Sequence, residues 1–142
     1  MALGLDTART IVAGARAHAA EAGFKPMTVV VLDDGGHVVV AEREDGSSMK
    51  RFEIARGKAH GALSLGMGSR SIMGRAEQQP YFIAAVTSAV GGSLVPVPGG
   101  VLVRDAQGIL LGAVGVTGDT SDNDESAAVA GIEGAGLTAQ AD

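Results

Sequence analysis

The run from Gly112 to Glu125 holds the densest group of residues that could do chemistry. Three glycines at three-residue spacing, Gly112, Gly115 and Gly118, lead into a polar turn with four carboxylates within seven positions. A glycine lets a flat ligand or another backbone approach closely, because it has no Cβ atom. The carboxylates could cap a helix, bind a cation or transfer a proton, and the pattern leaves these alternatives open.

The acidic residues favour a helix start over the other two alternatives. Asp122 and Glu125 have the spacing of a capping box, and Asp124 falls in the first turn, where the helix dipole favours an anion. The run lacks the glycine and the ligand spacing of a calcium loop. If a carboxylate here acts as a general base, Glu125 is the best candidate, and it would need a pKa raised by burial.

Three histidines are present, and their positions indicate different roles. His18 lies on the apolar stripe of a predicted helix, which suits either a hydrogen-bonded core residue or an imidazole presented to a cofactor iron. His37 follows two glycines and indicates a turn, whereas His60 lies on a predicted solvent face. No two histidines have the spacing H-x-x-x-H, and the chain has no cysteine, which argues against a structural zinc site.

The cationic residues offer sites for one or two carboxylates. Arg43 and Asp45 share a face of an extended segment, so they could pair with each other, or Arg43 could bind a ligand carboxylate. Lys58 lies at the margin of a buried stripe, where a lysine either extends outward or holds an anion. One sparse basic group also suits a solvated helix face: Lys50, Arg51, Arg56, Lys58, Arg70 and Arg75.

Length and composition limit the class of protein. A chain of 142 residues predicts a single domain, residues 1–142. The net charge of −5 argues against a nucleic-acid partner. We expect no membrane span, because no apolar run approaches the roughly 20 residues required. The N-terminus has no signal-peptide pattern, and the lack of cysteine fits a cytoplasmic location.

The elements that must position these residues follow from periodicity and turn signals. Two predicted hairpins and several helices indicate an α+β fold with an antiparallel sheet covered by helices. We predict helices over 6–22, 51–67, 70–77 and 122–133, a break at Pro80 with a helix or turn over 82–90, a loop over 91–100, and strands over 27–33, 38–42, 101–104 and 109–116.

Three segments, in order along nearly the whole chain, resemble the GlcG/HbpS-like family. They are V-V-V-L-D-D-G-G-H-V-V-V-A-E-R-E-D-G (29–46), I-A-R-G-K-A-H-G-A (54–62), and P-G-G-V-L-V-R-D-A-Q-G-I-L-L-G-A-V-G-V-T-G (98–118) followed by D-N-D-E (122–125). The resemblance implies a profilin-like fold, symmetric homo-oligomers up to octamers, and haem as a ligand of several members. By position, it implies that His18 is the iron ligand.

The resemblance leads to one hypothesis and leaves two others open. The first is a small oligomeric protein that binds haem or a related flat cofactor. In it His18 ligates iron, Arg43, Arg56 and Lys58 pair with the propionates, and Gly112, Gly115 and Gly118 allow close approach. The second is an enzyme acting on a small carboxylate or carbonyl metabolite, with Arg43 binding the substrate and Glu125 transferring a proton. The third is a structural subunit that assembles through Ala and Gly faces.

Overall fold

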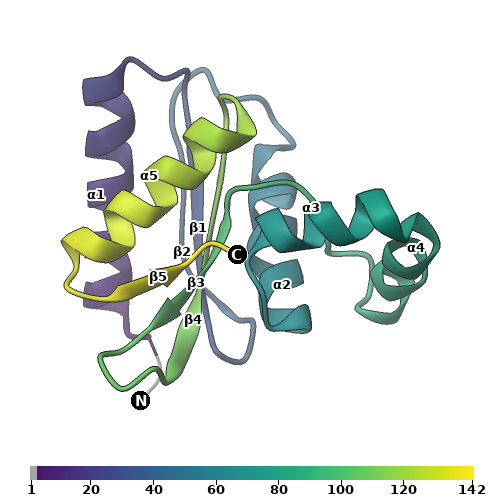
Figure 1. Cartoon of the computed structure of the whole chain (residues 1–142). Helices are drawn as coiled ribbons and strands as arrows, with labels where there is room; N and C mark the ends of the chain where they lie inside the picture. Colours follow the sequence, from purple (N-terminus) through teal and green to yellow (C-terminus); the bar gives the residue numbers. More distant parts are fainter. Residues whose placement is uncertain (1–2) are drawn as a thin grey trace.

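The computed structural model describes residues 3–142 and shows a five-stranded antiparallel sheet with helices on both faces (Figure 1). The strands lie in the order β2-β1-β4-β3-β5. The elements are α1 (Leu5–Ala22), β1 (Thr28–Asp33), β2 (Val38–Arg43), α2 (Arg51–Leu65), α3 (Ser69–Gln78), α4 (Pro80–Ala89), β3 (Gly100–Arg104), β4 (Leu110–Thr117), α5 (Ser121–Gly134) and β5 (Thr138–Gln140). The predicted α+β class is confirmed.

Both predicted hairpins form, and an aspartate closes each turn in the same way. The Asp33 carboxylate accepts the backbone N–H groups of Gly35 and His37 after β1. Asp105 does the same for Gln107 and Ile109 after β3. Such side chain-to-backbone bonds are the reason that aspartate favours turns. The hairpins then join through β1 and β4, which pair antiparallel from Thr28 with Thr117 to Asp33 with Gly112.

Helices cover the two faces of the sheet unequally. α1 and α5 pack against each other on one face, and α2 covers β1, β4 and β3 on the other (Figure 1). α3 and α4 extend away from the sheet beyond α2 (Figure 1). They enclose a small core of their own around Ile72, Ile83 and Leu94. The main core lies between the sheet and the α1–α5 layer.

Glycines bring α2 unusually close to the sheet. A Cβ atom on Gly115 of β4 would collide with the backbone carbonyl of Ala55 in α2, and one on Gly100 of β3 would collide with that of Lys58. Bulky side chains are therefore excluded from this contact, and the helix rests on the strands' backbone. This fit fixes the height and the register of α2 on the sheet.

Three elements differ from the sequence predictions. α4 is a complete helix that begins at Pro80 and ends at Ala89, because a proline is compatible with the first turn, where its missing N–H is not needed. α2 ends at Leu65, and Gly66 follows it in the left-handed conformation. β5 was not predicted; it pairs antiparallel with β3.

Among residues 3–142, no helix is long and apolar enough to cross a membrane.

Candidate functional site

His18 is half-buried near the end of α1, with its ring held on two sides. The ring packs edge-on against Phe24, with centroids 5.9 Å apart, and its Nε2 atom lies 3.4 Å from the Ser126 hydroxyl on α5. With Glu21 and Ala22 it lines a surface hollow of about 310 Å³. Within residues 3–142 no carboxylate forms an ion pair with this ring. The imidazole is therefore oriented by packing and reachable from outside.

Lys58 is buried and bound to protein groups. Its side chain is 2% exposed, and Nζ donates to the Val116 carbonyl at 2.9 Å and to Asp124 Oδ2 at 3.1 Å. Burial lowers the pKa of Lys58 and raises that of Asp124, and the attraction between the two opposes both shifts. The ammonium therefore ties α2 to the start of α5 and to the end of β4.

The start of α5 is organised by residues other than the predicted capping box. Thr120 is the N-cap, and its hydroxyl accepts the Asn123 N–H at 3.2 Å. The prediction that Asp122 and Glu125 form a capping box was wrong, because the N-cap is Thr120 and Asp122 already lies inside the helix. Asp124 instead accepts the Asp119 N–H at 2.9 Å. Asp119 in turn accepts the backbone N–H of Lys25, which with its other donors lowers its pKa to about 2.

Glu125 and Asp122 share one cation, Arg70 of α3. Arg70 Nε lies 3.0 Å from Glu125 Oε2, and its Nη2 donates to Asp122. These two carboxylates raise the pKa of Arg70 further above its already high value. Among residues 3–142, no hydrogen bond or ion pair joins Glu125 to Arg43, so the two predicted catalytic residues belong to separate clusters.

Arg43 lies at the end of β2 on an acidic part of the surface. Its Nη1 donates to the Ser47 carbonyl at 2.8 Å, and among residues 3–142 no ion pair joins Arg43 to Asp45. The neighbouring Arg16 pairs with Glu42 and Glu44 at 2.8 and 3.0 Å. A shallow hollow of about 310 Å³ lies among Arg16, Glu42, Arg43, Glu44 and Asp45.

Arg56 lines a different hollow, between α2 and the loop after α4. This space of about 300 Å³ is bounded by Phe52, Glu53, Arg56, Gly91, Gly92 and Ser93. His60, one turn further along α2, has Nδ1 2.7 Å from the Ser93 carbonyl, which holds the same loop in place. The predicted propionate partners Arg43, Arg56 and Lys58 thus do not surround His18 within one copy of the chain.

The three glycines of the Gly112–Glu125 run have two different roles. Gly112 and Gly115 are buried, and a Cβ atom on either would meet protein backbone, at Leu32 and Ala55 respectively. They therefore allow close backbone packing in the monomer. Gly118, with φ near +152°, lies past the end of β4 and does line a cavity.

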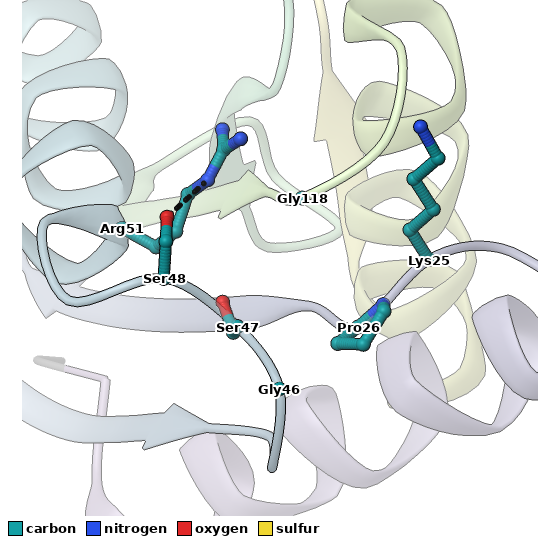
Figure 2. A pocket seen from close by; sticks show the side chains of 7 residues that line it. All are labelled: Lys25, Pro26, Gly46, Ser47, Ser48, Arg51 and Gly118. Atoms are coloured by element: carbon teal, nitrogen blue, oxygen red, sulfur yellow. Dashed lines mark hydrogen bonds between the residues drawn. The ribbon is translucent and has the colours of Figure 1, made fainter.

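This cavity was missed by the sequence reasoning, which placed Arg51 only in a sparse basic group. It has a volume of about 220 Å³ and lies between the start of α2 and the loops that precede β1 and follow β2 and β4 (Figure 2). Arg51 extends along it and donates to the hydroxyls of Thr117 at 2.9 Å and Ser48 at 3.2 Å. A signal was present in the run Gly46-Ser47-Ser48, which joins a strand to a cationic helix start.

The fold and these hollows define a small α+β protein with several shallow surface hollows and a half-buried histidine on α1. The chain belongs to the family described as haem degrading protein HbpS-like, whose model matches residues 3–133. The resemblance stated from three motifs is confirmed. A comparison with curated protein sequences returned no match.

Three solved structures show the same fold. A complex of PduOC with heme is 22% identical, with a TM-score of 0.84 over 96% of this chain and 97% of that one. A double mutant of Streptomyces reticuli HbpS is 28% identical, with a TM-score of 0.79 over 94% of this chain and 86% of that one. Klebsiella pneumoniae protein ORFY is 24% identical, with a TM-score of 0.83 over 94% and 90%.

Proposed function

We propose that this protein binds haem, that His18 would hold the iron, and that a second copy of the chain would complete the site. The family description and the heme complex of PduOC support the class of ligand. The single observation that carries the proposal is the position of His18, whose ring is fixed by Phe24 and opens onto a surface hollow. When bound, haem supplies an iron centre for which a histidine nitrogen is an ordinary ligand.

The shape of the hollow supports the involvement of a second copy. Its lining of His18, Glu21 and Ala22 is too small to enclose a porphyrin, which would leave most of the ligand in water. Ligand sites usually bury most of the surface of what they bind. A second copy placed over the hollow would cover the other face. In this proposal the oligomer is built from dimers and extends up to an octamer.

In this proposal the three predicted propionate partners have different roles: Arg43 and Arg56 contact haem directly, and Lys58 does not. Arg43 is exposed and Arg56 half-buried, so either can reach a propionate of haem bound to a neighbouring copy. Lys58 acts indirectly, because its ammonium is held by Asp124 and Val116. Its role is to keep α2 and α5 in the arrangement that places Ser126 beside His18.

Hemin titration of the purified protein tests the proposal. We expect a shifted Soret band that saturates in the wild type and is lost or moved in His18→Ala. His37→Ala is the matched control, because His37 is also a histidine but is 80% exposed in a hairpin turn beside Asp33. An unshifted Soret band in the wild type, or an unchanged one in folded His18→Ala, would contradict the assignment.

A further inference from the structure

The cavity at the start of α2 is a cationic site in an acidic protein. Lys25 and Arg51 line it together with Pro26, Gly46, Ser47, Ser48 and Gly118, whereas the chain as a whole carries a net charge of −5. Among residues 3–142, no aspartate or glutamate lines this cavity. Asp119 lies close by, but its carboxylate already accepts N–H groups of Lys25, Thr120 and Asn123.

Arg51 differs from the arginines that are neutralised in this structure. Arg16 and Arg70 each pair with two carboxylates, whereas the acceptors of Arg51 are the uncharged hydroxyls of Ser48 and Thr117. Those two bonds use Nε and Nη1 and fix the plane of the guanidinium. The positive charge of Arg51 also repels the buried ammonium of Lys58 and contributes to the lowered pKa of Lys58.

Arg51 and Lys25 both line this small cavity, on opposite sides of Gly118 in Figure 2. Figure 2 shows the guanidinium of Arg51 and the ammonium of Lys25 pointing to the same side, with Gly118 between them in the view. The Ser47 hydroxyl, bonded to Thr28 Oγ1 at 2.8 Å, forms part of the wall from the β2–α2 loop. A bound anion would therefore meet one oriented fork, one flexible ammonium and hydroxyl groups.

The volume limits the ligand. At about 220 Å³ the cavity lies below the roughly 300 Å³ at which sites for drug-sized ligands begin, so it excludes a porphyrin. A planar carboxylate matches the guanidinium fork better than a spherical anion does. We propose that this cavity binds a small organic acid with one or two carboxylates, through Arg51 and Lys25, separately from the haem site.

Calorimetric titration with malonate and glycolate, at constant ionic strength in chloride, tests this proposal. We expect saturable binding of at least one of the two acids to the wild type, at least tenfold weaker in Arg51→Gln. Lys50→Gln is the matched control, because it removes the same charge from the adjacent residue, which is 70% exposed and does not line the cavity. It should bind like the wild type.

Two further variants keep the test decisive. Arg51→Lys retains the charge and loses the fork, so we expect weaker binding even if Arg51→Gln folds poorly. His18→Ala should bind the acid normally, which separates this site from the haem proposal. The proposal fails if neither acid binds to the wild type at 10 mM, if folded Arg51→Gln binds equally well, or if inorganic phosphate alone binds.

Discussion

At the scale of single residues, the buried Lys58–Asp124 ion pair carries a large desolvation cost. Both side chains are 2% exposed, and each is the other's charged partner. Taking a charge out of water is costly, and the cost is offset here by the ion pair and by hydrogen bonds to Val116 and Asp119. Removing one partner leaves the other as an uncompensated buried charge.

We therefore expect Lys58→Met to reduce the free energy of unfolding by about 3–5 kcal/mol. The double variant Lys58→Met/Asp124→Asn should recover part of this loss, because asparagine keeps the acceptor for the Asp119 N–H without the charge. Urea unfolding of the wild type, both single variants and the double variant gives the coupling energy. Lys50→Met removes an exposed cation, whose ammonium is 4.0 Å from Glu53, and should change stability little. A coupling energy near zero would contradict the interpretation.

Much of the residue-level arrangement was beyond what local pattern can predict. His18 on one face of a helix and His37 in a turn followed from spacing alone, and both lie where expected. The partner of Lys58 could not be found this way, because Asp124 belongs to a helix near the other end of the chain and meets Lys58 only through the tertiary fold. The same applies to Arg70 with Glu125 and to Arg51 with Thr117.

At the scale of elements, α2 depends on glycine in the strand beneath it. We expect Gly115→Ala to destabilise the protein by about 3 kcal/mol, because the new methyl group would collide with the Ala55 backbone carbonyl and displace the helix. Gly74→Ala is the control: a Cβ atom there meets nothing within 4 Å, and alanine favours the helix by roughly 0.5–1 kcal/mol. Thermal or urea unfolding measures both. Equal stability of Gly115→Ala and the wild type would show that α2 is not held as described.

The sequence predicted the elements with strong periodicity and failed at those that depend on a neighbour. The two hairpins and the helices 6–22 and 122–133 were found because their apolar spacing and turn residues agree. β5 has three residues and no alternating pattern of its own, so its pairing with β3 is what makes it a strand. For α4 the sequence predicts only a break at Pro80 and a helix or turn over 82–90, because a proline can end one helix and also begin the next.

At the scale of the whole molecule, α4 presents apolar surface that the chain does not cover. Within residues 80–89, Ile83 alone is buried, and Tyr81 is 71% exposed. Exposed apolar groups of this kind are typical of interaction surfaces. If the protein forms the proposed oligomer, α4 is therefore one surface that a second copy could cover, in addition to the hollow at His18.

We expect Tyr81→Asp to shift the association equilibrium toward a species of 14.1 kDa, the mass of one chain, because a carboxylate would be buried at the interface. Sedimentation velocity at several concentrations measures the change. Ile109→Asp, at the tip of the second hairpin with a 55% exposed side chain, is the comparison and should leave association unaltered. Dissociation by Ile109→Asp but not by Tyr81→Asp would place the interface at the hairpin.

The pairing of β1 with β4 has a consequence for synthesis on the ribosome. β1, β2 and α2 emerge early. β4, which pairs with the other edge of β1 and carries the Gly115 on which α2 rests, is made much later. Until then Val29, Val30 and Val31 can pair with β2 on one side only, and the core around them is not closed. The nascent chain therefore passes through a stage in which the β4-facing edge of β1 is an open, apolar sheet edge, the kind of edge that favours aggregation.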